Sequence, residues 1–150
     1  MSAERALHPA GGGCTVTGLS LPSLQAYQAA SLVIMTCEAY SLHEAWLRER
    51  AGGYGEILRA RLLLGVLLTS ADYLWAVRRR HELCAITTTA AADVDVLVTL
   101  GAADEAPEIE AVPGLGYLKK PGFYHPFNLT GWPAISVRSG FGGKGLPLSI

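Results

Sequence analysis

A run without glycine or proline, from residue 24 to residue 50, is the feature that most constrains the fold of this chain. The run is rich in Ala, Leu, Glu and Gln, which are all good helix formers. Apolar residues recur three and four apart within it and therefore share one helical face. They are Leu32, Met35, Ala39, Leu42 and Trp46. We predict one long helix here, entered through Ser20 as the N-cap or Pro22 in the first turn.

Two shorter helices are predicted after the glycines at 52–55 end the first one. The second is expected over residues 56–68 and the third over residues 70–85. Ser70 and Asp72 are the expected caps of the third helix. The first six residues are interpreted as the last turn of a helix that begins upstream.

The second half of the chain follows a different pattern. Short β-branched runs predict strands at residues 94–99 and 134–137, in addition to one at 14–17 and one beginning at residue 146. Residues 101–121 hold several prolines and glycines and have no period, which is typical of a long functional loop. Helices and strands that alternate indicate an α/β protein.

The predicted strands are short, apolar and far apart in the sequence, so they need neighbours that cover both faces and both edges. We therefore interpret residues 1–150 as one domain that is truncated at both ends and holds part of a mixed central sheet flanked by helices. The mean hydropathy of +0.28 is high for a soluble domain of this size, and it indicates either an unusually rich core or apolar surface that a partner normally covers.

Composition excludes several classes of function. The net charge of −1 and a single basic cluster at residues 78–80 do not favour nucleic acid or an anionic membrane. The longest apolar stretch, residues 62–77, is interrupted by Asp72 and is too short to cross a bilayer. Three widely spaced cysteines without a CxxC pair predict reduced thiols in a cytoplasmic compartment, with no disulfide and no zinc site. No cofactor is expected.

Local motifs for other chemistries are weak. The Gly-Gly-Lys-Gly string at 142–145 lacks the Ser or Thr that a phosphate loop needs after its lysine, which favours a hairpin turn. There is no G-x-S-x-G nucleophile elbow. A catalytic pair of Cys37 and His43 stays open as a minor alternative, although no residue in the pattern would orient it.

One stretch is more specific than the other motifs. It is PFNLTGWPAISV at residues 126–137, followed by Gly140-Phe141 and by GLPL at 145–148. It resembles the C-terminal motif of the amidase-signature family, which includes bacterial amidases and the A subunit of the aspartyl/glutamyl-tRNA amidotransferase. The segments at 59–65 and 93–99 also resemble that family. The chain departs from the pattern at Leu100-Gly101, where the family has proline, and at Val137-Arg138-Ser139.

The resemblance implies an α/β fold and hydrolysis of amide C–N bonds by a Ser–cis-Ser–Lys triad. In that triad the lysine takes a proton through the bridging serine, and backbone N–H groups stabilise the oxyanion. The family carries these residues around a glycine- and serine-rich signature, and we find no such signature here. The only lysines are Lys119, Lys120 and Lys144. We therefore expect no catalytic residue in this chain and no independent activity.

The resemblance implies three substrate-binding residues. Arg61 matches a position that faces a substrate carboxylate, a role that suits a guanidinium fork, although a surface arginine or a local salt bridge is an equal alternative. Phe127 and Asn128 begin the motif near the floor of the pocket, where Asn128 would more readily hydrogen-bond the backbone of a tight turn than touch substrate.

The expected partners are a small amide substrate for the intact enzyme and either a complementing N-terminal half or a second copy of the chain. No nucleic acid and no membrane are expected. A hypothesis of another class is a non-catalytic binding or assembly module that oligomerises through its exposed apolar surface.

Overall fold

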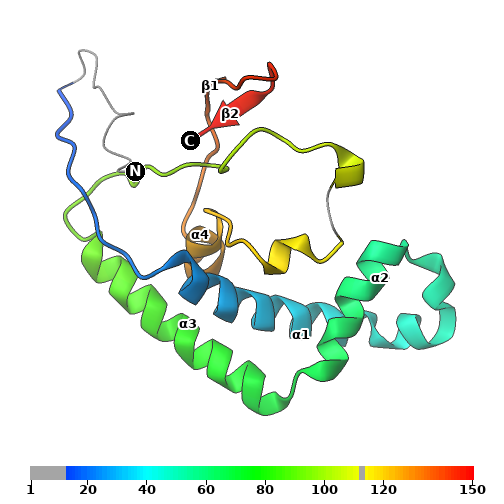
Figure 1. The fold of residues 1–150 in the computed structure, drawn as a ribbon. Helices are drawn as coiled ribbons and strands as arrows, with labels where there is room; N and C mark the ends of the chain where they lie inside the picture. Colours follow the sequence, from blue (N-terminus) through cyan, green and yellow to red (C-terminus); the bar gives the residue numbers. More distant parts are fainter. Residues whose placement is uncertain (1–12, 112–113) are drawn as a thin grey trace.

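The computed structural model describes residues 13–111 and 114–150 (Figure 1). The expectation for the first six residues lies outside these ranges. Helix α1 spans Leu24–Arg50, as the sequence predicts. Its N-cap is Ser23, whose hydroxyl accepts a hydrogen bond from the N–H of Ala26 at 3.3 Å. Ser20 as cap and Pro22 in the first turn were wrong, because Ser23 is the residue from which a hydroxyl reaches the third helical N–H.

The apolar stripe predicted for α1 is largely exposed. Met35, Leu42 and Trp46 are 50%, 77% and 47% exposed, whereas α1 buries Tyr27 and Ala30 near its beginning. The spacing placed the stripe on one face correctly. It did not tell which face the chain covers, because burial depends on the elements that pack against the helix.

The next two helices confirm the sequence prediction with changed ends. Helix α2 spans Glu56–Leu63 and continues as the 3-10 helix η3 over Leu64–Leu67. Helix α3 spans Ser70–Ala90, five residues beyond the predicted end. Thr69 is its N-cap and forms a capping box with Asp72, so Asp72 was predicted correctly and Ser70 was not. A short 3-10 helix η2, Ala51–Gly53, separates α1 from α2.

The PFN motif forms a helix that the sequence pattern did not predict. Helix α4 spans His125–Thr130, with a proline in its first turn, and ends at Gly131 in the left-handed conformation with φ of 77°. Two single-turn 3-10 helices, η4 at Ile109–Ala111 and η5 at Gly116–Leu118, interrupt the loop before it.

The sheet is smaller than predicted. Strands β1 (Arg138–Phe141) and β2 (Pro147–Ser149) form a two-stranded antiparallel hairpin, and the glycines at 142–145 form its turn. Pairing begins at Val137, which exchanges both backbone hydrogen bonds with Ile150, so the strand predicted at 134–137 is displaced. In the described residues neither 14–17 nor 94–99 forms a strand, and no mixed central sheet is present. A strand needs a hydrogen-bonded neighbour, and β-branched composition alone does not provide one.

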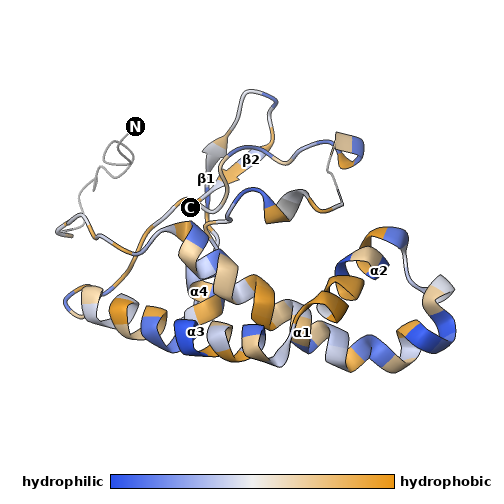
Figure 2. Ribbon diagram, turned by 60° about the horizontal axis from the view of Figure 1, so that its bottom comes forward, coloured by the Kyte–Doolittle hydropathy of each residue, from blue (hydrophilic) through white to orange (hydrophobic). Residues whose placement is uncertain are grey.

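The core lies where α1, α3 and α4 meet (Figure 1). Tyr27, Ala30, Leu83 and Leu129 are fully or almost fully buried there. The buried hydroxyl of Tyr27 lies 2.5 Å from that of Thr87, so the polar end of the tyrosine is paired. Figure 2 shows hydrophobic residues recurring along α1, α2 and α3, with hydrophilic residues gathered at the C-terminal end of α1.

No single helix of the described residues has both the length and the apolar character to span a bilayer. The two segments Glu56–Leu67 and Ser70–Ala90 reach those limits only when taken together, and they meet at a bend of 98°.

Candidate functional site

Arg61 lies in the last turn of α2 and holds the loop that precedes α4. Its Nε donates to the carbonyl oxygen of Gly114 at 2.9 Å. A Cβ at Gly114 would lie 3.6 Å from Ile57, so the loop packs directly on α2 at this point. The predicted carboxylate-binding arginine is therefore, in this structure, a side chain that positions the loop.

Phe127 and Asn128 lie on α4, which packs against α1 and α3. Phe127 is half-buried and its carbonyl oxygen accepts from the N–H of Gly131 at 2.8 Å. Thr130 closes the same turn, with its hydroxyl donating to the carbonyl oxygen of Pro126 at 2.8 Å. The Asn128 side chain is exposed and makes no hydrogen bond to the described residues, so the turn is closed without it.

The structure does not bring Arg61 together with Phe127 and Asn128. Helix α4 packs beside the first part of α1, around Tyr27 and Ala30, whereas α2 and η3 pack beside its later part, around Tyr40 (Figure 1). The loop from residue 114 to residue 124 joins the two positions. It is held at one end by Arg61 and further along by Gln28, whose Nε2 donates to the carbonyl oxygen of Lys120 at 3.4 Å.

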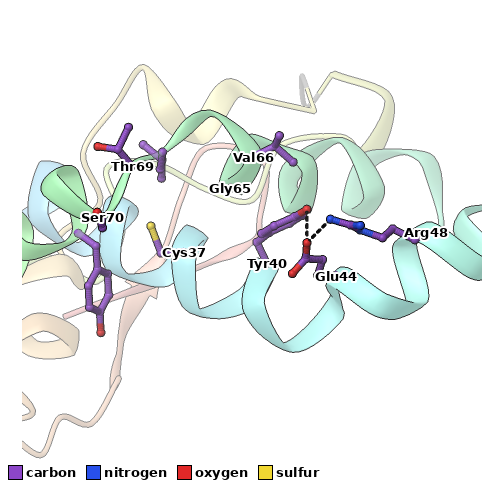
Figure 3. Close-up of a pocket in the computed structure, with 10 residues that line it drawn as sticks. Cys37, Tyr40, Glu44, Arg48, Gly65, Val66, Thr69 and Ser70 are labelled. Carbon is purple, nitrogen blue, oxygen red and sulfur yellow. Dashed lines mark hydrogen bonds and ion pairs between the residues drawn. The ribbon is translucent and has the colours of Figure 1, made fainter.

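An open cleft of about 520 Å³ lies between α1 and the segment from η3 to the start of α3 (Figure 3). Tyr40, Glu44 and Arg48 follow one another along the α1 side of it. Glu44 accepts from the Tyr40 hydroxyl at 3.4 Å and pairs with Arg48 at 2.5 Å. The two charges neutralise each other at an exposed position, so they add little binding energy for a charged ligand.

Gly65 lines this cleft where η3 approaches α1 most tightly, at Tyr40. A Cβ there would overlap the Cβ of Tyr40, so only glycine lets η3 approach α1 this closely.

Cys37 lines the same cleft, and its chemistry argues against the minor alternative of a cysteine enzyme. Burial raises the pKa of the Cys37 thiol, and the negative charges of Asp72 and Glu38 raise it further. A thiol of raised pKa holds less of the reactive thiolate at neutral pH. The Nδ1 of His43 hydrogen-bonds the Tyr54 hydroxyl at 2.9 Å, and no hydrogen bond joins His43 to Cys37 in the described residues.

His125 is a residue that sequence reasoning did not single out. It is 4% exposed, and both ring nitrogens are buried without a hydrogen-bond partner among the described residues. The ring of Tyr124 packs against it with the centroids 4.4 Å apart. Burial lowers the pKa of His125, which keeps the imidazole neutral at physiological pH. Its position beside the PFN motif was the signal available in the sequence.

In the ranges 13–111 and 114–150, no group of three or more His, Cys, Asp or Glu side chains is placed to hold a metal ion. The arrangement thus offers binding surfaces and one neutral buried histidine.

The chain is similar in sequence to known amidases and amidotransferase subunits. A family model described as amidase matches residues 2–150. The chain is 36% identical over 110 residues to the A subunit of the glutamyl-tRNA(Gln) amidotransferase of Parvibaculum lavamentivorans, an alignment that covers 69% of this chain and 22% of that protein. It is 33% identical over 108 residues to the putative amidase AmiD of Mycobacterium tuberculosis, with 67% and 22% covered.

A solved crystal structure of an amidase superposes with a TM-score of 0.75 and 27% sequence identity. The match covers 87% of this chain and 31% of the amidase chain. The chain therefore spans between about a fifth and a third of the length of the relatives named above.

Proposed function

The chain belongs to the amidase family, and on that premise we propose that it supplies part of the substrate pocket of an amide-hydrolysing enzyme. The catalytic serines and lysine of that enzyme lie, in this proposal, in polypeptide outside these 150 residues. The observation that carries the proposal is the family match over residues 2–150, a range that includes the PFNLTGWPA motif.

The positions of the lysines support the second part of the proposal. Lys119 and Lys120 are exposed in the loop before α4, and Lys144 is exposed in the turn of the hairpin. A lysine that acts as a base at neutral pH needs burial or neighbouring positive charge to lower its pKa. Exposed loop lysines lack the burial, so none of the three suits the triad.

The proposed contribution of this chain is the wall of the pocket. Arg61 holds the loop at Gly114 and, in this proposal, also faces a substrate carboxylate, which a guanidinium can bind as a fork. Phe127 and Asn128 present an apolar surface and an amide from the short helix α4. Binding by this wall lowers the barrier only where the reacting groups are also present.

Ammonia release from simple amides by the purified chain tests the dependence on an external triad. We expect no release above that of buffer, because without a nucleophile the rate falls towards what binding alone supplies. The amidase whose crystal structure superposes on this chain is assayed in parallel as the positive control. Measurable amide turnover by the chain alone would contradict the proposal.

Exposed apolar side chains favour a second candidate function, a non-catalytic module that assembles with copies of itself. Leu42 and Leu67 are 77% and 75% exposed, and Trp46 and Trp75 are about half exposed. Such surface is unusual for a monomer. Light scattering distinguishes the two functions: a single oligomer that melts cooperatively and binds little ANS favours the assembly module, whereas a monomer that binds ANS favours an incomplete enzyme.

A further inference from the structure

His125 is buried on α4, the short helix that carries the PFN motif, and neither of its ring nitrogens is paired. It is 4% exposed, and both Nδ1 and Nε2 lack a hydrogen-bond partner among the described residues. It lies on the buried side of α4 with Pro126 and Leu129, and Leu129 belongs to the core that α4 shares with α1 and α3. An imidazolium here would bring a full charge and two N–H donors into surroundings that offer neither nitrogen a partner.

No acidic side chain of the described residues is placed to balance that charge. Helix α4 has no acidic residue, and Glu49 is exposed near the C-terminal end of α1. The titratable and charged groups that its neighbours bring towards α4 are Tyr27 on α1, Arg80 and Cys84 on α3, and Tyr124 and Lys120 in the loop before it. The other carboxylates of α1 and α3 form their hydrogen bonds elsewhere: Glu38 with Tyr73, Glu44 with Arg48, Asp72 with Thr69 and Glu82 with Arg79. Burial is accordingly what lowers the pKa of His125.

Few contacts hold α4 against the two long helices. Leu129 is the one side chain that α4 contributes to the core cluster of the described residues. Its carbonyl oxygen accepts from Nε of Arg80 at 2.8 Å and from the thiol of Cys84 at 3.9 Å. Helix α4 has only six residues and ends at Gly131, where φ is 77°. A helix this short has little stability of its own, so its place depends on these contacts.

Helices α1 and α3 are joined independently of α4. The hydroxyls of Tyr27 and Thr87 lie 2.5 Å apart near one end of the pair, and the Tyr73 hydroxyl donates to Glu38 at 3.2 Å towards the other end. Strands β1 and β2 likewise pair with each other and not with α4. Helix α4 can therefore leave its position as a local unit while the two long helices and the hairpin stay folded.

We propose that protonation of His125 releases α4 from α1 and α3, so that mild acid withdraws the surface that Phe127 and Asn128 form. The release does not depend on the function proposed above, whereas its consequence for substrate binding rests on that function. In the released state the imidazole meets water and titrates at about pH 6.5, whereas in the packed state it stays neutral. The released population is therefore constant above about pH 7.5 and rises about tenfold between pH 7.5 and pH 5.5.

Hydrogen exchange of the 150-residue chain, followed by NMR, tests the proposal. The reporters are two amides of α4: the N–H of Asn128 donates to the carbonyl oxygen of Tyr124 at 3.0 Å, and that of Gly131 donates to Phe127 at 2.8 Å. Their protection factors, which are corrected for the intrinsic pH dependence of exchange, are expected to fall about tenfold from pH 7.5 to pH 5.5. At pH 5.5 they should also lie at least about tenfold below those of the most protected amides of α1 and α3, which exchange only on global unfolding.

Variants at position 125 separate the titration from the burial. His125→Phe and His125→Leu are neutral at both pH values, so the protection of α4 is expected to change by less than about twofold in each. His125→Lys is charged at both pH values once α4 is released, and it should show low protection already at pH 7.5. The control is His81→Phe, at an exposed position of α3, which should behave as the wild type does. Circular dichroism shows that α1 and α3 stay helical in each variant.

Cys84 provides a second measurement, because its half-buried thiol contacts α4 at Leu129. The variants Cys14→Ser and Cys37→Ser together leave it as the one cysteine of the chain. A pyridyl disulfide, which labels thiols in mild acid, should react with Cys84 at pH 5.5 several-fold faster when residue 125 is histidine than when it is phenylalanine. Comparison at one pH removes the pH dependence of the reagent itself.

Protection factors of α4 that do not change with pH, or that fall equally in His125→Phe and His125→Leu, would overturn the inference. Amides of α4 that are as protected at pH 5.5 as those of α1 and α3 would also overturn it, since α4 would then be released only by global unfolding. Equal labelling of Cys84 with either residue at position 125 would argue against the release as well. None of these outcomes contradicts the proposed function, which the assay of ammonia release tests separately.

Discussion

At the scale of single residues, His125 stands out because both of its ring nitrogens are buried without a hydrogen-bond partner among the described residues. A buried polar group without a hydrogen-bond partner costs free energy in proportion to the hydration that it gives up. Its ring packs against that of Tyr124, and Arg80 and Cys84 of α3 donate to the carbonyl oxygen of Leu129, four residues further along. Burial alone lowers the pKa of His125, and no counter-charge offsets it.

This histidine should make the chain sensitive to acid. Its pKa is lowered in the folded state, whereas in the unfolded chain it is about 6.5. The unfolded chain therefore binds the proton first, and the free energy of unfolding falls as the pH drops below about 6.5, by up to about 1.4 kcal/mol per pH unit. Above about pH 7.5 the contribution no longer changes. Urea titrations at pH 7.5 and pH 5.5 measure this loss.

The matched variants are His125→Phe, which keeps the ring and removes the titration, and His81→Phe at an exposed position of α3. His125→Phe is expected to lose most of the difference between the two pH values, and His81→Phe to keep it. Equal acid sensitivity in wild type and His125→Phe would mean that another group controls the transition.

A second residue contact joins the long loop to the hairpin. The Glu105 carboxylate accepts from the N–H of Lys144 at 2.9 and 3.2 Å, and a Cβ at Gly142 would overlap one of its oxygens. Gly142→Ala should therefore displace the Glu105 side chain, as Glu105→Ala removes it. Both variants are expected to speed hydrogen exchange at the Lys144 amide several-fold, whereas the exposed Glu108→Ala does not. An unchanged Lys144 amide in both variants would show that the contact does not hold the turn.

At the scale of elements, α3 depends on a cap that lies one residue before the predicted one. The Thr69 hydroxyl accepts from the N–H of Asp72 at 3.2 Å, and the Asp72 carboxylate accepts from the N–H of Thr69 at 2.8 Å. The Thr69 hydroxyl, which donates to the Asp72 carboxylate at 2.7 Å, and then the Thr69 N–H hold the pKa of Asp72 below its ordinary value. The contribution is therefore present above about pH 4 and is lost as the pH falls further.

Thr69→Ala should cost about 1 kcal/mol of stability, the usual value for loss of an N-cap. Ser70→Ala is the matched control, since Ser70 is the first helical residue and its side chain makes no hydrogen bond to the described residues. Thermal melts followed by circular dichroism compare the two. If Ser70→Ala proved as costly as Thr69→Ala, the capping box would not be what begins this helix.

The helices could be predicted from the sequence because their signals are local. Absence of glycine and proline over 24–50, and Gly52-Gly53 after it, act through neighbouring residues whatever the rest of the fold does. The β-branched runs at 14–17 and 94–99 were equally clear, but neither forms a strand in the described residues, because pairing needs a second segment. Helix α4 was missed because it has six residues, one of them a proline, and these are too few to show the spacing of apolar residues that indicates a helix.

The candidate site also combines a local signal, which the sequence shows, with contacts between distant segments, which it does not show. The PFN motif could be recognised because its residues are consecutive, and its family is confirmed by the match over residues 2–150. That Arg61 bonds Gly114, 53 residues further along, depends on how α2 and the loop pack, which no local pattern contains. The substrate-binding roles of Arg61, Phe127 and Asn128 stay predictions.

At the scale of the whole molecule, the chain exposes more surface than a compact protein of its size. Its accessible surface is 11,078 Å², whereas a folded monomer of this mass exposes about 7,300 Å². The excess agrees with the small core that α1, α3 and α4 share among the described residues. It also agrees with a chain that spans about a fifth of its curated relatives.

A small core should make the stability depend on very few side chains. Leu83 is fully buried between α1 and α4, and Leu83→Ala is expected to cost about 3 kcal/mol through lost burial and the cavity it leaves. In a chain with so few buried apolar residues that loss is a large share of the total stability, so the variant should be largely unfolded at 37 °C.

Leu42→Ala, at a position 77% exposed, is the control and should change stability by less than about 0.5 kcal/mol. Urea titrations followed by the fluorescence of the three tryptophans, Trp46, Trp75 and Trp132, compare them. If the exposed face carrying Leu42 is covered by copies of this chain, Leu42→Ala will destabilise the protein in a concentration-dependent way, and the chain would then be an assembly in its own right.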